Sequence, residues 1–360
     1  MSGRINVFGV LNHQAHQYDM LKLSKTHNVK FWYLENNVRR WSKYGGRPEP
    51  TTWLTKDEFE WVTFYEPGKY DVAILHSDQQ HVDPLIGKGA LYRQLNDLIQ
   101  DVNKIVVQHG TPMYDSYPED YVINGGTVQT TRGKRSIDGM KDLVGDNFMI
   151  VNSYEAVDRW GWGYPLIHPV YPDEWWDLPK EPRVILPLSP GGLDTYYNRS
   201  LCTAIKSAVY EKSGITIIHP NVNITFDADN WTQYREFLGS TLIAIFPFKD
   251  SPMPRSRDEA MASGCVVLSS RYHGASEYIE HGVDGFIVPD NPLSYATAID
   301  ALINEAYTEA VEMGQRGKEK VKKLFTPKRY NDELYHIISE VANGRIPKWD
   351  GKKIWDNLNG

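Results

Sequence analysis

Short apolar runs rich in β-branched residues alternate with amphipathic segments along the chain. In the first half, the apolar runs occupy residues 5–10, 29–34, 72–75, 105–108 and 148–151. The segments 14–26, 91–99 and 152–160 follow such runs and are predicted to be helical, with apolar positions at helical spacing in 91–99. Short runs that are apolar throughout are typical of parallel strands buried on both faces. The pattern therefore predicts an α/β fold with a doubly wound parallel sheet.

The same alternation resumes after a proline-rich segment in the middle of the chain. Five prolines lie between residues 165 and 182. Apolar runs follow at residues 183–188, 215–220, 242–248 and 265–268, and helices are predicted near 200–210, 293–325 and 330–341. We therefore predict two Rossmann-like, doubly wound domains, over residues 1–168 and 183–342, joined by a linker at 169–182.

Composition narrows the class of protein. The chain has 360 residues, of which 41% are hydrophobic and 24% charged, as in a soluble globular enzyme. No apolar run approaches the ~20 residues that span a bilayer, and residues 1–7 lack the apolar core of a signal peptide. With only Cys202 and Cys265, a disulfide framework is excluded and the cytoplasm is the expected compartment. The net charge of −7 argues against broad affinity for nucleic acids.

The most informative stretch spans residues 246–289. A short helix containing Glu259 stops at Gly264 and is followed at once by an apolar run. A second acidic helix with Glu277 comes next, and then a glycine-rich turn over residues 281–285 that leads into another strand. This order describes two successive αβ units. In a doubly wound sheet, the loops of such units lie at the edge where ligands bind.

This arrangement resembles the donor-binding half of retaining glycosyltransferases of the GT-B fold, known as group 1 or family 4. Their motif reads roughly E-x7-E, with the second Glu in EAMA-x-G-x-P-V-V, followed by GG-x-x-E and a glycine-rich turn. Glu259, Glu277 and the turn fall at the matching offsets, but the position of the first Glu is occupied by Ser251. The resemblance implies two domains facing across a cleft. Residues 1–168 would bind the acceptor, residues 183–342 would bind a nucleotide sugar, and a tail at 343–360 would cross back to the first domain.

The resemblance also assigns a donor site. Glu259 is suited to bind the ribose hydroxyls, because an ionised carboxylate accepts two hydrogen bonds from a vicinal diol. Arg199 and Arg255 are the predicted catalytic cations that stabilise the leaving diphosphate. The other residues predicted to bind the nucleotide or its phosphates are Gly191, Gly192, Arg257 and Glu277, and those predicted to hold the sugar are Asp250, Ser251 and Met253. Alternatively, Arg199 pairs with an acid on its own helix.

Histidines mark the predicted acceptor side. His109 follows the strand at 105–108, and the resemblance implies that it faces the transferred sugar as a catalytic residue. His13 and His16 follow the first strand and, with Asp115, are predicted to bind the acceptor, because a helix N-terminus at a sheet edge attracts anions and hydroxyl-rich groups. The alternative is structural, with His109 in a turn and one of the other histidines capping its helix.

The resemblance implies transfer with retention of configuration, without a metal ion and without a cofactor other than the nucleotide-sugar donor. The leaving phosphate oxygen would deprotonate the acceptor. Asp227 and Asp229 form a D-x-D sequence that is typical of metal-dependent enzymes. They precede a predicted helix start at Asn230, however, and capping explains both carboxylates.

Two further functions stay open. One is transfer to hydroxymethylated bases of DNA, for which the cations of residues 38–47 and of residues 127–142, within a polar insertion at 124–142, provide contacts. The other is binding of sugar nucleotides without catalysis, suggested by the missing first Glu. The acceptor (a glycan, a lipid, a small molecule or a modified DNA base), the donor nucleotide, and a monomeric or homodimeric state are left open by the sequence.

Overall fold

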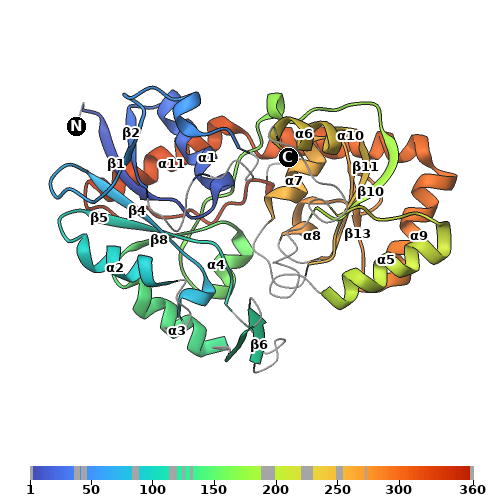
Figure 1. The fold of residues 1–360 in the computed structure, drawn as a ribbon, viewed down its shortest axis with the longest axis horizontal. Coiled ribbons are helices and arrows are strands. Elements are labelled where there is room, and N and C mark those ends of the chain that lie inside the picture. The colour runs from blue at the N-terminus through green and yellow to red at the C-terminus, as the bar shows by residue number, and fades with distance from the viewer. Residues whose placement is uncertain are drawn as a thin grey trace. The chain divides into compact units, whose positions relative to one another are not determined.

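The chain divides into two compact units in a computed structural model. Unit 1 comprises Met1–Asp120, Val128–Pro169 and Pro327–Lys352, and unit 2 comprises Tyr121–Thr127, Val170–Thr326 and Lys353–Gly360. The structure describes residues 3–35, 41, 47–82, 89–112, 120–123, 126–129, 133–187, 199–219, 230–248, 254–271 and 274–356. Figure 1 shows the elements of both units.

Unit 1 is built on a seven-stranded parallel sheet with the strand order β3-β2-β1-β4-β5-β8-β9. Its strands are β1 (Ile5–Val10), β2 (Val29–Leu34), β3 (Phe59–Val62), β4 (Val72–Ser77), β5 (Asn103–Gln108), β8 (Phe148–Val151) and β9 (Tyr164–Pro165). All five predicted strands are confirmed. The edge strands β3 and β9 are short and had not been predicted.

Alternate residues of each strand face two separate cores, so that Val7 and Phe8 lie on opposite faces of the sheet. Helices α1 and α11 cover one face, and α2, α3 and α4 cover the other (Figure 1). The helices are α1 (Gln14–Leu21), α2 (Ala90–Leu98), α3 (Gly133–Val144), α4 (Tyr154–Trp160) and α11 (Pro327–Ala342), with short 3-10 segments η1 (Lys22–Lys25), η3 (Pro50–Thr52) and η4 (Gln79–Val82). This confirms the doubly wound arrangement.

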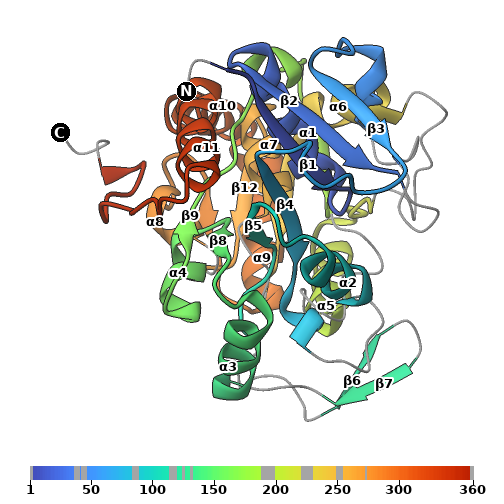
Figure 2. The same cartoon turned by 90° about the vertical axis from the view of Figure 1, so that its left-hand side faces the viewer.

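The stretch predicted as a polar insertion, residues 124–142, contains regular structure. Strands β6 (Asp120–Ile123) and β7 (Gly126–Gln129) pair in a two-stranded sheet (Figure 2). Helix α3 follows, and its buried Met140 and Val144 join the core beneath the large sheet. Those apolar positions explain why this part of the stretch folds as a helix.

The C-terminal boundary of the units differs from the predicted one. Helix α11, assigned by the sequence to the domain at 183–342, lies in unit 1, because its buried Leu334, Ile337 and Ile338 pack with the sheet and α1. The predicted tail at 343–360 is divided as well. Trp349 stacks on Tyr154 of unit 1, with ring centroids 5.4 Å apart, whereas residues from Lys353 onward lie in unit 2.

Unit 2 contains a four-stranded parallel sheet with the order β10-β11-β12-β13. Its strands are β10 (Glu181–Ile185), β11 (Thr241–Phe246), β12 (Val266–Ser269) and β13 (Phe286–Ile287), and Ile218 forms an isolated parallel bridge with Ile185. The strand expected at 215–220 is reduced to this bridge within the described residues. The other strands predicted for this half, at 183–188, 242–248 and 265–268, correspond to β10, β11 and β12. Their parallel pairing confirms the second Rossmann-like core.

The helices of unit 2 follow the predicted order. They are α5 (Arg199–Ser213), α6 (Asn230–Gly239), α7 (Arg255–Ala262), α8 (Ala275–Tyr278), α9 (Pro292–Asp300) and α10 (Tyr307–Leu324), with η6 (Pro172–Glu174) and a π-helical turn η8 (Ala301–Glu305) between α9 and α10. Along the described chain, we find no helix with both the length and the apolar character that crossing a bilayer requires.

A close backbone contact fixes α7 against α10. Gly264, which ends the α7 turn, has a φ of 75°, a left-handed conformation that favours glycine. Its carbonyl oxygen faces Gly314 of α10, where a Cβ atom would lie only 2.2 Å away. The two glycines therefore allow α10 to pack directly on the turn that joins α7 to β12.

Candidate functional site

Three helix starts meet at one edge of the unit 2 sheet. Helix α5 follows β10, α7 follows β11 and α8 follows β12. Because these strands are parallel, their carboxyl ends and the helix starts that follow lie at the same edge. Arg199 is the first residue of α5 and Arg255 is the first residue of α7. The topology therefore brings both predicted catalytic cations to this edge.

Arg255 and Glu259 form an ion pair on α7. They are four residues apart, which places them on one side of the helix, and Nη2 of Arg255 lies 3.6 Å from Oε1 of Glu259. Their side chains are only 10% and 9% exposed. A carboxylate and a guanidinium in this setting form a polar patch suited to a ligand that has both hydroxyl and anionic groups.

Arg257 points into the interior instead. It is fully buried, its Nε donates to the hydroxyl of Tyr278 over 2.8 Å, and its Nη1 donates to Ser269 Oγ over 3.4 Å. The Tyr278 hydroxyl in turn donates a hydrogen bond to the buried Asp258 carboxylate. The prediction that Arg257 contacts phosphate conflicts with this burial, because its guanidinium is engaged in a core network.

The Tyr278 hydroxyl stays protonated in this network. Burial raises its pKa well above the ordinary value of 10.0; Arg257 opposes this shift and Asp258 adds to it. A protonated hydroxyl accepts from Arg257 and donates to Asp258, so it joins the two charges. This network fixes the start of α7 to α8.

Glu277, predicted to bind the donor nucleotide, is in contact with the C-terminal segment. Its Oε2 pairs with Nζ of Lys353 and accepts a hydrogen bond from Nε1 of Trp355 over 3.2 Å. The Trp355 ring is buried and stacks on Tyr278, with centroids 5.6 Å apart. Neither Lys353 nor Trp355 had been predicted from the sequence. The available signal was a pair of tryptophans, Trp349 and Trp355, in the mostly polar segment 343–360.

Some predicted positions lie outside the described residues. They are Gly191, Gly192, Asp250, Ser251, Met253 and Asp115, together with Asp227 and Asp229 of the D-x-D sequence. Arg199 is described as an exposed residue. Over the ranges that the structure covers, no three His, Cys, Asp or Glu side chains are grouped so that they could hold a metal ion.

Unit 1 brings the three predicted histidines together. The His109 ring lies 4.3 Å from the ring of His13 and 5.0 Å from the ring of His16, centroid to centroid. The histidines come from the loop after β1, from α1 and from the end of β5, which meet at the carboxyl edge of the sheet. His13 occupies the N-cap position of α1 but makes no capping side-chain hydrogen bond.

A fourth histidine, His76, was missed by the sequence analysis. Its Nδ1 lies 2.8 Å from Nε2 of His109, and the two rings are nearly parallel, at 12°. His76 is in β4, next to β5, and the register pairs it with Val107, two residues before His109. A histidine near the end of an apolar strand was a usable signal, because the neighbouring strand carries His109 at the same edge.

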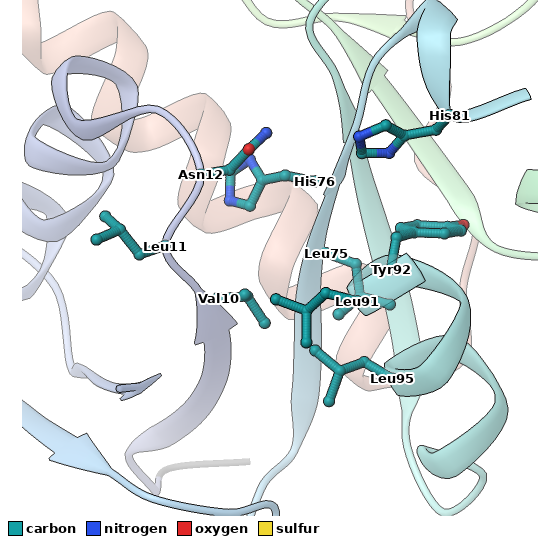
Figure 3. A pocket seen from close by; sticks show the side chains of 9 residues that line it. All are labelled: Val10, Leu11, Asn12, Leu75, His76, His81, Leu91, Tyr92 and Leu95. Carbon is teal, nitrogen blue, oxygen red and sulfur yellow. The ribbon is translucent and has the colours of Figure 1, made fainter. Parts of the chain in front are cut away.

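A small cavity of about 30 Å³ borders His76 and has room for a water molecule. Figure 3 shows that the polar side chains of Asn12, His76 and His81 gather at one end of it. The other end is apolar and is formed by Val10, Leu75, Leu91 and Leu95. His76 therefore lines this cavity and also contacts the ring of His109.

Comparison with known proteins finds a family match within the second half of the chain. Residues 217–320, which include Glu259 and Glu277, match the sequence family described as glycosyl transferases group 1. A segment of 83 residues is 32% identical to human alpha-1,3/1,6-mannosyltransferase ALG2. This segment covers 23% of the present chain and 20% of that relative, so the chain matches about a fifth of its length.

Solved structures extend the similarity to the whole fold. HepE of Anabaena, in complex with UDP and glucose, has a TM-score of 0.61 over 93% of this chain and 100% of its own. Sucrose-phosphate synthase from Thermosynechococcus elongatus has a TM-score of 0.62 over 95% and 100%. Both are 12% identical to this chain, so they show the fold alone. The chain therefore has the GT-B fold, and in residues 217–320 it resembles the group 1 glycosyltransferases.

Proposed function

We propose that the protein is a retaining, metal-independent glycosyltransferase that moves a sugar from a nucleotide-sugar donor to a hydroxyl acceptor. The observation that carries this proposal is the Arg255–Glu259 pair, 3.6 Å apart at the ligand-binding edge of the unit 2 sheet. Both residues lie in the part of the chain that matches group 1 glycosyltransferases. Structures of HepE in complex with UDP and with UDP-glucose support a nucleotide sugar as the class of donor.

Each member of the pair has a separate task. The Glu259 carboxylate accepts hydrogen bonds from the two ribose hydroxyls and so anchors the nucleotide. Arg255, with Arg199 at the start of α5, stabilises the negative charge that builds on the leaving diphosphate. A fixed donor aimed at such charge lowers a barrier by roughly 3–4 kcal/mol. The existing contact with Glu259 holds Arg255 in place before the donor binds.

The acceptor hydroxyl is deprotonated by the leaving phosphate oxygen on the same face of the sugar. This route needs no pair of protein carboxylates, in contrast to glycoside hydrolysis. It also fits a chain with Ser251 in place of the first Glu of the motif. His109 contacts the transferred sugar in this proposal, and His13 and His16 contact the acceptor. The free thiols of Cys202 and Cys265 fit a reducing compartment, for which we propose the cytoplasm.

Thermal unfolding in the presence of UDP-, GDP-, ADP- and dTDP-sugars tests donor binding directly. A ligand at 100 times its dissociation constant adds about 2.7 kcal/mol to the free energy of unfolding. We expect one nucleotide class to raise the melting temperature of wild type but not that of Glu259→Gln. The matched control is Glu312→Gln, an exposed position on α10. The proposal fails if no nucleotide sugar stabilises wild type, or if Glu259→Gln responds as wild type does.

A further inference from the structure

The orientation of one buried amide is fixed by its backbone partners. Gln17 is fully buried on α1; its Oε1 accepts from the backbone N–H of Asn12 over 2.7 Å, and its Nε2 donates to the backbone carbonyl of Val10. A backbone N–H only donates and a carbonyl only accepts, so the two ends of this amide cannot be exchanged. Nε2 carries a second hydrogen and lies 3.4 Å from Nε2 of His76.

This second N–H fixes the proton of His76. Since Gln17 donates to Nε2 of His76, that nitrogen acts as an acceptor, and a neutral imidazole then carries its proton on Nδ1. Nδ1 of His76 lies 2.8 Å from Nε2 of His109. The Nδ1–H of His76 therefore donates to His109, whose Nε2 becomes the acceptor and whose own proton lies on Nδ1.

We propose that Gln17 and His76 are positioning residues that hold His109 as the Nδ1–H tautomer. In this form, Nδ1 of His109 donates a hydrogen bond to a sugar hydroxyl and does not act as a base. The chain of contacts is buried, with His76 and His109 6% and 5% exposed. The rings of His13 and His16 lie beside His109, with centroids 4.3 and 5.0 Å away, so four histidines form the site. Of these, His76 is the one in contact with the amide of Gln17.

The tautomer is inferred from the contacts of Gln17, His76 and His109, whereas its use toward a sugar rests on the proposed function. A nitrogen that already bears a proton cannot remove one from an acceptor, and it binds a hydroxyl through the oxygen lone pair. A His109 that donates a hydrogen bond and removes no proton agrees with a reaction in which the leaving phosphate takes the acceptor proton. Gln17 and His76 act through His109.

Long-range ¹H–¹⁵N spectra of protein labelled at the histidine imidazoles test the tautomer. His109→Ala and His76→Asn identify the two sets of signals by their loss. We expect the proton on Nδ1 for both residues in wild type. In Gln17→Glu, a carboxylate oxygen replaces the amide N–H, so His76 should carry its proton on Nε2 and His109 should change to the Nε2–H form. A wild-type His109 with its proton on Nε2, or no change in Gln17→Glu, would overturn the proposal.

A second pair of variants keeps the test decisive if Gln17→Glu does not fold. The side-chain amide of asparagine places an N–H where Nδ1 of histidine was, so His76→Asn should keep His109 in the Nδ1–H form and keep most of the kcat. His76→Leu removes that donor and should lower kcat roughly tenfold with little change in the KM for the donor. Equal kcat values for the two variants would contradict the proposal. If the spectra agree but no transfer occurs with any nucleotide sugar, the proposed function fails while the tautomer stands.

Discussion

The Nε atom of Arg257 lies 2.8 Å from the hydroxyl oxygen of Tyr278 inside unit 2, although Arg255, two residues earlier, pairs with Glu259 at the edge of the sheet. Residues two apart on a helix face different sides. Neighbouring arginines on α7 thus have separate tasks. Arg257 belongs to the network that fixes α7 to α8, and Arg255 belongs to the proposed donor site.

Removing the buried cation should destabilise the fold. Arg257→Met leaves the buried Asp258 without the positive charge that Tyr278 links to it, and such a loss typically costs about 3–5 kcal/mol. Tyr278→Phe removes the hydroxyl contacts with Arg257 and Asp258, at a cost of about 1–3 kcal/mol. Urea denaturation measures both. Arg316→Met, at an exposed ion pair on α10, is the control and should lose less than about 1 kcal/mol. Equal losses for Arg257→Met and Arg316→Met would contradict the structural role of Arg257.

The glycine contact between α10 and the α7 turn predicts a second stability effect. In Gly314→Ala the new methyl group would lie 2.2 Å from the Gly264 carbonyl oxygen, so α10 must shift. Overpacking of this kind costs about 1–3 kcal/mol, which exceeds the roughly 1 kcal/mol gained from helix propensity. Thermal unfolding should therefore show a net loss for Gly314→Ala and little change for Glu312→Ala on the same helix. A stabilised Gly314→Ala protein would show that the contact does not constrain α10.

The C-terminal segment should contribute to the stability of unit 2. Trp355→Ala removes a buried ring from Tyr278 and a hydrogen bond from Glu277, and the expected loss is about 3–5 kcal/mol. Trp355→Phe keeps one stacked ring but loses the N–H and part of the buried indole, so a smaller loss of about 1–3 kcal/mol is expected. If calorimetry shows the same melting temperature for wild type and Trp355→Ala, the segment is not part of the folded unit.

Asp177 should make the fold sensitive to acid. Burial by itself would raise its pKa, but hydrogen bonds from Lys318 and Gln315 and the charges of Lys180 and Lys318 hold it below the ordinary value of 3.8. The stabilisation is therefore complete at pH values above this ordinary value, which holds in the unfolded chain, and is lost as the pH falls through the lower folded pKa.

Urea denaturation between about pH 6 and pH 2 measures this effect. The stability difference between wild type and Asp177→Asn should shrink toward the acid end. Asp173→Asn, at an exposed position in the same segment, serves as the control and should follow wild type. If the stability difference between wild type and Asp177→Asn stays constant over this pH range, the partners of the Asp177 carboxylate do not stabilise its ionised form.

The sequence predicted the parallel sheets because strands buried on both faces read as unbroken apolar runs. It missed β3, whose sequence Phe59-Glu60-Trp61-Val62 is short and mixed, as in a half-exposed edge strand. It assigned α11 to the wrong unit, because an amphipathic pattern shows that a helix has an apolar face but not which core that face meets.

The site was predictable only in part, because a sequence pattern does not show how a helix packs against the rest of its unit. Motif spacing predicted Glu259, and the end of an apolar strand predicted His109, but the helical phase that buries Arg257 and leaves Arg255 at the edge depends on the packing of α7. The contacts of Glu277 with Lys353 and Trp355 join residues more than 70 positions apart. Nothing local in the sequence indicates such pairs.

Steady-state transfer by Arg255→Ala, Arg255→Lys and wild type, with the nucleotide sugar identified by thermal unfolding, tests the central claim most directly. The account predicts that Arg255→Ala stays folded and loses about 100- to 1,000-fold in kcat, because a donor aimed at the leaving diphosphate is gone. Arg255→Lys should recover part of that loss. A folded Arg255→Ala protein with the kcat of wild type would contradict the assignment of the reacting centre to the start of α7.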